Sequence, residues 1–200
     1  MNLAEFYDER CKPNAKSWEA CHWRSRESQL DNFDMLLNIA SIRPSDTILD
    51  VGCGQGDFYQ QTKLKGVTSF TGIDVSPKMI WTCKRRFPAA RWEVADLKDV
   101  EGQWDWVFAS GAFNHVGQDL GESITKMFSL ARNGIGLTVL SWYDPTDVSK
   151  RADYLQNHDP VRALEVAFSL TRWVNMNHTA LDGQFVLFMY KDEFINGAGG

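Results

Sequence analysis

The stretch Ile48-Leu49-Asp50-Val51-Gly52-Cys53-Gly54-Gln55-Gly56-Asp57 decides the fold of this chain. A short apolar segment, typical of a buried strand, ends in an acid and runs straight into a loop of alternating glycines. Open α/β sheets bind their ligands where a strand passes into such a loop. A carboxylate beside the loop opposes a bound pyrophosphate and favours a cation. The stretch therefore predicts an α/β fold with a ligand site at this loop.

The charge balance of the chain is acidic. Its 200 residues suffice for one domain with a sizeable core, and the formal net charge is -5 at pH 7. A surface that follows a phosphate backbone needs clustered Lys and Arg, so no nucleic-acid partner is expected. The one basic cluster, Lys84-Arg85-Arg86, is short, and we expect it to end a helix, where cations complement the helix dipole.

The four cysteines give no sign of a metal site or of a disulfide framework. None forms a Cys-x-x-Cys pair, so no bound metal is expected, and we interpret all four as reduced thiols of a cytosolic protein. The N-terminus lacks a basic region followed by an apolar one, and no apolar run approaches membrane-spanning length. We therefore expect a cytoplasmic protein without membrane contact.

Strand-like and helix-like patterns alternate along most of the chain, which is typical of parallel βαβ units. The last two strands are too close for a crossover helix, so they should pair antiparallel. This pattern predicts a seven-stranded, mostly parallel, doubly wound sheet with an antiparallel edge. The expected strands are 47–51, 69–74, 91–95, 104–109, 134–141, 172–177 and 184–190, and the expected helices are 26–40, 56–64, 77–87, 122–131 and 160–170. The expected division is an N-terminal helical segment that caps the site (1–43), one domain (44–193) and a disordered tail (194–200).

Three acids recur at the ends of successive predicted strands: Asp50, Asp74 and Asp96. In a doubly wound sheet these points line one crevice. Asp74 follows Gly54 by 20 residues, the spacing at which a carboxylate accepts hydrogen bonds from the two hydroxyls of a ribose. The ligand is therefore expected to be a nucleoside derivative, with Asp96 and the backbone of Leu97 available to the edge of an adenine.

A nicotinamide dinucleotide is the competing ligand for this loop. Its fingerprint is Gly-x-Gly-x-x-Gly, whereas this chain has Gly-x-Gly-x-Gly followed by Asp57. Asp50 and Asp57 would both repel a pyrophosphate. S-adenosylmethionine carries no phosphate, and its sulfonium and ammonium groups both gain from nearby carboxylates. We therefore favour S-adenosylmethionine and keep an NAD-linked oxidoreductase as the weaker alternative.

Four segments, in order and at the family's spacing, resemble the class I, Rossmann-like S-adenosylmethionine-dependent methyltransferases. That family's fold is a seven-stranded sheet of order 3-2-1-4-5-7-6 with strand 7 antiparallel. A weaker similarity, at Trp23 to Gln29, at Ala109 to Asn114 and in the last two strands, is to small bacterial and phage-type members of unassigned substrate. The four segments are Leu49 to Gly56, Gly72 to Met79, Val94 to Leu97 and Trp104 to Val107.

The resemblance implies a role for each residue of the cofactor site. The loop glycines would let the backbone approach the methionine moiety, Asp50 would lie near its ammonium group, and Asp74 would take the ribose. Val75 and Met79 would sandwich the adenine, although Met79 also has the helical spacing of a core residue. The full predicted set is Trp23, Asp50, Gly52, Cys53, Gly54, Gly56, Asp74, Val75, Met79, Asp96, Leu97 and Ser110.

The acceptor half of the reaction has weaker signals. His115 is the only histidine that the pattern places near the carboxyl edge of the strands, as a general base or as a capping residue. Trp23, Trp142 and Tyr143 could roof the pocket, or the last two could pack at a strand end. The loop after the fourth strand lacks the Asn/Asp-Pro-Pro-aromatic run of related enzymes that methylate amines of nucleic acids.

The expected function is therefore in-line methyl transfer to a small-molecule acceptor. Such transfer needs little acid–base help when the acceptor is already nucleophilic. The alternative of a different class is a module that binds S-adenosylmethionine without turnover. The expected assembly is a monomer or a weak homodimer, and the acceptor and the atom that is methylated stay open.

Overall fold

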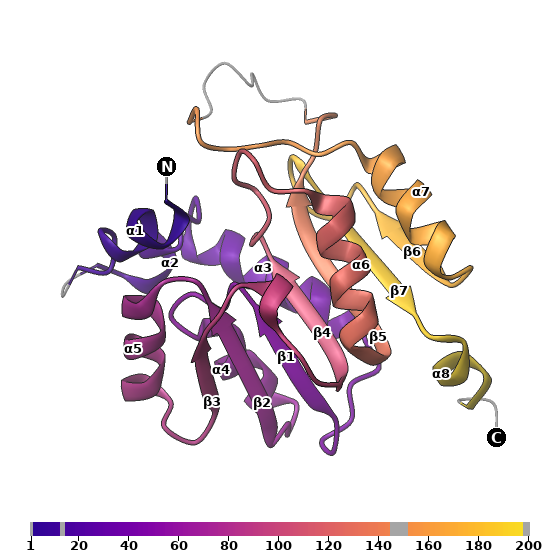
Figure 1. The fold of residues 1–200 in the computed structure, drawn as a ribbon, viewed down its shortest axis with the longest axis horizontal. Helices are drawn as coiled ribbons and strands as arrows, with labels where there is room; N and C mark the ends of the chain where they lie inside the picture. The colour runs from indigo at the N-terminus through magenta and orange to yellow at the C-terminus, as the bar shows by residue number, and fades with distance from the viewer. Residues whose placement is uncertain (1, 13–14, 145–151, 198–200) are drawn as a thin grey trace. The chain divides into compact units, whose positions relative to one another are not determined.

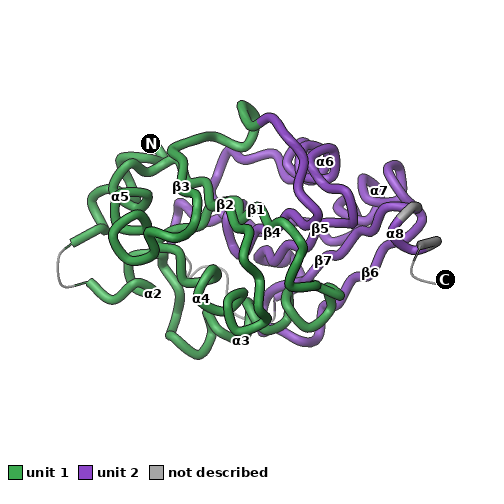
Figure 2. Tube along the Cα trace, turned by 90° about the horizontal axis from the view of Figure 1, so that it is seen from below, with its two compact units in different colours: residues 1–100 green, residues 101–200 purple. Residues whose placement is uncertain are grey.

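The computed structural model describes residues 2–12, 15–144 and 152–197. The chain divides into two compact units, residues 1–100 and residues 101–200, which are coloured separately in Figure 2. Each unit contains its own strands and helices. Among the described residues, no helix combines the length and the apolar character that crossing a membrane requires.

The sheet strands of the first unit run parallel. They are β1 (Thr47–Val51), β2 (Ser69–Asp74) and β3 (Arg91–Val94), with β2 paired to both of the others. Four of the five β1 residues are buried, which explains the continuous apolar run interrupted only by Asp50. The register places Asp50 beside Gly72 and Asp74 beside Val94, so the acids that end β1 and β2 lie at the same edge.

The helices of the first unit begin at caps that the sequence supplies. Ser25 accepts a hydrogen bond from Ser28 N at the start of α3, and Ser76 accepts one from Met79 N at the start of α5, where Pro77 is the first residue. The helical elements are α1 (Leu3–Asp8), α2 (Ser17–Ala20), α3 (Arg26–Ile39), α4 (Asp57–Leu64), α5 (Pro77–Arg86) and the 3-10 turn η1 (Leu97–Asp99).

The second unit combines parallel and antiparallel strands. Strand β5 pairs parallel with β4 and antiparallel with β7, and β7 pairs antiparallel with β6. Helix α6 packs on β4 and β5, and α7 packs against α6 and β6 (Figure 1). The elements are β4 (Trp104–Ser110), α6 (Leu120–Leu130), β5 (Ala131–Leu140), α7 (Pro160–Leu170), β6 (Val174–Asn177), β7 (Gln184–Tyr190) and α8 (Asp192–Gly197).

The seven strands follow the order β3-β2-β1-β4-β5-β7-β6, which confirms the predicted topology and the antiparallel last strand. The differences lie at element ends. Strand β5 begins at Ala131 rather than at residue 134, because α6 passes directly into it at Leu130. Strand β6 begins at Val174 rather than at residue 172, since the hydroxyl of Thr171 bonds to Tyr190 O and Trp173 N just before it.

The end of the chain departs from the predicted disordered tail. Residues Asp192–Gly197 form α8, so the expectation of disorder is wrong for residues 194–197. The aromatic ring of Phe194 packs edge-on against Trp106 at 5.2 Å between centroids and parallel to Tyr190 at 6.2 Å. This apolar anchor explains why the helix forms before the glycine-rich end. Residues 198–200 lie outside the described part of the chain.

Candidate cofactor site

The glycine loop is a tight turn that is hydrogen-bonded to the end of β2. The backbone N–H groups of Gly52 and Cys53 both donate to Ile73 O at 2.9 Å. Gly54 has φ +53°, the left-handed region that favours glycine, and a Cβ built there would lie 2.5 Å from the Sγ of Cys21. The thiol of Cys21 therefore occupies the place where a side chain at residue 54 would stand, so both the backbone conformation and the packing require glycine here.

Asp74 is bound to this loop through one carboxylate oxygen and to the start of α5 through the other. Oδ2 accepts from Gly54 N at 3.0 Å, and Oδ1 accepts from Ser76 N at 2.9 Å. Each carboxylate oxygen has a second lone pair, so the group can still accept from two hydroxyls of a ligand. The structure thus joins the first predicted strand end to the second through a fixed, 8% exposed carboxylate.

Asp50 is a buried acid without a full set of partners. It is 2% exposed, and its Oδ2 has no hydrogen-bond partner among the described residues. Burial, with a smaller contribution from the charge of Asp74, raises the pKa of Asp50 well above its ordinary value. A carboxyl group in this position gains from a ligand that brings a cationic donor, such as an ammonium group.

The pKa of Asp74 leads to a pH prediction for the ligand-free protein. Burial raises this pKa from 3.8 to about 6, against the opposing hydrogen bonds from Ser76 and Gly54 and with a contribution from the charge of Asp8. At pH values between 3.8 and about 6, Asp74 is therefore mostly protonated in the folded state and mostly ionised in the unfolded state. The contribution of Asp74 to stability must then fall as the pH rises through this window.

We expect wild-type protein to lose stability relative to Asp74→Asn as the pH rises from about 4 to 7. The measurement is urea unfolding of both proteins at several pH values, without ligand. Because Asp50 is present in both, its own titration largely cancels in the difference. A stability difference that grows in favour of the wild type with rising pH would contradict the assignment.

The predicted adenine-binding residues have unequal surroundings. Met79 is fully buried, and its Sδ lies 3.1 Å from the Sγ of Cys11, so in this conformation it packs as a core residue. Leu97 is buried at the start of η1, and Val75 is partly exposed. Asp96 is exposed; it caps η1 by accepting from Lys98 N at 3.2 Å and pairs with Lys98 Nζ at 3.4 Å. The Asp96 carboxylate thus stabilises the η1 turn, independently of any contact with a ligand.

The N-terminal segment lies against the loop and against the start of α5. Besides the contact of Cys21 with Gly54, the carboxylate of Asp8 accepts from Ser76 Oγ at 2.5 Å and from Lys78 N at 3.1 Å. The indole of Trp23 packs edge-on against Phe33 of α3. These contacts are compatible with the expected cap over the site, which stays a prediction for residues 1–43.

One argument made from the sequence is wrong. Asp57 was expected to repel a pyrophosphate, but its carboxylate is 2% exposed and forms an ion pair with Arg86 at 2.8 Å and a longer one with Arg26 at 3.7 Å. A compensated, buried charge does not oppose an anionic ligand. Within the described chain, the preference for a cationic ligand therefore rests on Asp50 and Asp74.

The two predicted residues of the second unit have local partners there. Ser110 ends β4, and its Oγ lies 3.4 Å from the Oγ1 of Thr138. His115 is 5% exposed, its backbone N donates to Gln118 Oε1, and its ring stacks on Tyr154 at 5.5 Å between centroids. Burial and stacking favour a packing role for this imidazole.

His115 is not the only histidine near the ends of β4 and β5. His158 Nε2 lies 2.6 Å from Phe113 O, and since a carbonyl only accepts, Nε2 carries the proton and Nδ1 is left as the acceptor. Burial lowers the pKa of His158, although the bond to Phe113 opposes this, so the neutral ring is favoured. His178 Nε2 lies 2.6 Å from Ser141 Oγ.

A signal in the sequence could have located His158. It directly precedes Asp159-Pro160, which caps and starts α7, and helices of α/β units begin at the carboxyl edge of the sheet. Three contacts of the glycine loop had no comparable signal: Gln55 Nε2 donates to Cys11 Sγ at 3.7 Å, Arg86 Nη1 donates to Gln55 O at 2.7 Å, and the Cys21 thiol lies against Gly54. They join segments far apart in the chain without any fixed spacing.

Comparisons with known proteins agree with this geometry. Residues 48–134 match a family model described as a methyltransferase domain. A putative methyltransferase of Mycobacterium tuberculosis is 32% identical over 124 residues, which cover 57% of this chain and 74% of that protein. The chain belongs to the class I S-adenosylmethionine-dependent methyltransferases.

More distant methyltransferases support the assignment of the fold but do not identify the acceptor. Malonyl-[acyl-carrier protein] O-methyltransferase of Serratia marcescens is 25% identical over 147 residues, 72% of this chain; the chain spans about half (56%) of that relative's length. Magnesium protoporphyrin IX methyltransferase from Synechocystis PCC 6803, solved with bound SAH, superposes with a TM-score of 0.68 at 15% identity, covering 94% of each chain. A putative methyltransferase in complex with the Haloferax volcanii Trm112 activator gives 0.74 at 13% identity, covering 94% of this chain and 96% of that one.

Proposed function

We propose that this protein transfers the methyl group of S-adenosylmethionine to a small-molecule acceptor by in-line displacement. The observation that carries the proposal is the Asp74 carboxylate, fixed by Gly54 N and Ser76 N at the end of β2. This group would hold the ribose hydroxyls of the cofactor. Asp50 fits the same cofactor, because an ammonium group would supply the partner that its buried Oδ2 lacks within the described chain.

Three observations support a small molecule as the acceptor. The net charge of -5 opposes a nucleic-acid substrate. The loop after β4 reads Gly111-Ala112-Phe113-Asn114, without the paired prolines of enzymes that methylate nucleic-acid amines. Finally, a structural neighbour is named for magnesium protoporphyrin IX, a small molecule, and a relative is named for a malonyl group on its acyl-carrier protein.

An already nucleophilic acceptor would need no strong general base. Positioning and exclusion of water can supply much of the rate of a methyl transfer. If a base takes part, His158 is better prepared than His115, because the bond to Phe113 O leaves its Nδ1 as a proton acceptor. His115, the base proposed from the sequence, is stacked on Tyr154.

The function is tested with S-adenosylmethionine labelled in its methyl group and an extract that contains small molecules, proteins and nucleic acids. We expect S-adenosylhomocysteine to form and the label to enter the small-molecule fraction. Label confined to protein or nucleic acid contradicts the proposed acceptor class. Saturable binding of S-adenosylmethionine without any S-adenosylhomocysteine formation favours the binding module without turnover.

A further inference from the structure

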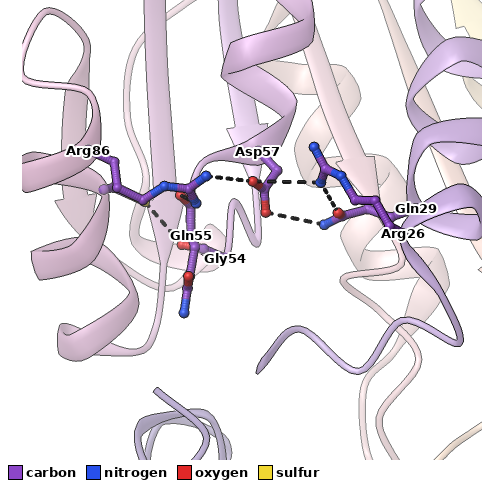
Figure 3. Close-up of polar contacts among 7 residues, drawn as sticks. Arg26, Gln29, Gly54, Gln55, Asp57 and Arg86 are labelled. Atoms are coloured by element: carbon purple, nitrogen blue, oxygen red, sulfur yellow. Dashed lines mark hydrogen bonds and ion pairs between the residues drawn. The ribbon is translucent and has the colours of Figure 1, made fainter. Parts of the chain in front are cut away.

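Two sequence features of the first unit are not used by the proposed reaction: the residues Arg24 to Gln29, which follow Trp23, and the basic cluster Lys84-Arg85-Arg86 at the end of α5. The structure brings both to the helix that follows the glycine loop. Arg26 and Gln29 of α3 and Arg86 of α5 converge on the buried carboxylate of Asp57 in α4 (Figure 3). Side-chain contacts to Asp57, which directly follows the glycine loop, thus join α3, α4 and α5.

The carboxylate of Asp57 is the centre of this cluster. Its Oδ1 accepts from Arg86 Nη2 at 2.8 Å and lies 3.7 Å from Arg26 Nη1, while its Oδ2 accepts from Gln29 Nε2 at 3.4 Å. Arg26 Nη1 also donates to Gln29 Oε1. Since Asp57 is 2% exposed, these partners replace the water that an ionised carboxylate needs.

Arg86 has a second contact that Arg26 lacks. Its Nη1 donates to Gln55 O at 2.7 Å, so one guanidinium spans the loop backbone and the Asp57 carboxylate (Figure 3). One turn earlier on α5, Cys83 Sγ donates to Gly54 O at 3.1 Å. Helix α5 thus holds two consecutive loop carbonyls, and the N–H of Gly54 donates to Asp74.

We propose that Arg86 is a positioning residue that fixes the glycine loop in its cofactor-binding conformation. Asp57 orients the guanidinium, and Arg26 and Gln29 compensate and hold Asp57. The planar fork of arginine places two donors in fixed directions, whereas the single ammonium of lysine cannot take the same two acceptors in that geometry. The effect on cofactor affinity rests on the proposed function, whereas the effect on the loop itself does not.

The experiment compares Arg86→Lys with Arg26→Lys. Both keep the positive charge beside Asp57, and the two arginines are about equally exposed, at 32% and 33% of their side chains. Of these two arginines, Arg86 is the one that donates to a carbonyl of the glycine loop. Calorimetric titration with S-adenosylhomocysteine should show about a tenfold weaker affinity for Arg86→Lys and less than a twofold change for Arg26→Lys, at similar melting temperatures.

Hydrogen–deuterium exchange of the ligand-free proteins gives a readout that needs no cofactor. The peptide containing Gly52 to Asp57 should exchange faster in Arg86→Lys and at the wild-type rate in Arg26→Lys. Wild-type exchange in Arg86→Lys, or equal acceleration in both variants, overturns the positioning role. If loop exchange is faster in Arg86→Lys alone but the wild-type protein binds no S-adenosylhomocysteine, the positioning role of Arg86 is supported and the proposed function is refuted.

Discussion

Replacing Asp74 by alanine is expected to weaken the binding of S-adenosylhomocysteine by about 5- to 150-fold, which corresponds to ~1–3 kcal/mol. The variant removes the carboxylate that is proposed to accept from the ribose hydroxyls. It also releases the N–H groups of Gly54 and Ser76, which the carboxylate holds in place. The less ordered loop and the lost ligand contacts therefore both lower the affinity for S-adenosylhomocysteine. Isothermal titration calorimetry measures the affinity.

Asp99→Ala is the matched control for this variant. Asp99 is an exposed acid of η1 in the same unit, so its removal changes the net charge equally without touching the loop. We expect the affinity of Asp99→Ala for S-adenosylhomocysteine to stay within about twofold of the wild-type affinity, because exposed charges contribute little. Equal affinities for Asp74→Ala and Asp99→Ala would show that the cofactor is held elsewhere.

Gly72→Ala is expected to destabilise the fold by about 2 kcal/mol, a typical cost of overpacking a core. Gly72 lies in the middle of β2, and a Cβ there would stand 2.3 Å and 2.5 Å from two ring atoms of Trp92 and 3.0 Å from Cys53 Sγ. Trp92 is itself packed against Tyr59 and Phe70, so the ring has little room to move. Thermal unfolding should show a melting temperature lower by roughly 4–8 °C.

A double-mutant cycle isolates the cause. Trp92→Leu removes the ring atoms that the new methyl group meets, so the combined variant should be more stable than the sum of the two single losses predicts. Additive losses would place the cost of Gly72→Ala in the backbone of β2 rather than in the clash with Trp92.

The sheet was predictable because its signals are local. Buried strands show as apolar runs, such as Thr47 to Val51, and Ser76-Pro77 marks a helix start by its own chemistry. The order of the strands came from the resemblance of four ordered segments to one family. Phe194 shows the limit of this approach, because the ring partners that stabilise α8 lie in other strands and leave no mark beside it.

The candidate site was predictable as a set of strand ends, but not as a network of interactions. The spacing between Gly54 and Asp74 led to the assignment of Asp74 to a ribose, which stays a prediction, whereas the bond from Gly54 N to Asp74 Oδ2 was not predicted. The charge of Asp57 was misjudged because its partner, Arg86, stands 29 residues away with no periodic relation to it. Sequence spacing locates the ends of neighbouring strands, whereas compensation of a buried charge depends on which side chains the packing brings together.

The crystal structure of the complex with S-adenosylhomocysteine tests the central claim most directly. The predicted result is a ligand over the glycine loop, with its ribose hydroxyls donating to the carboxylate of Asp74 and its amino group beside Asp50 Oδ2. A ligand bound away from Gly54, or bound at the loop with neither carboxylate in contact, would contradict the assignment of these two acids.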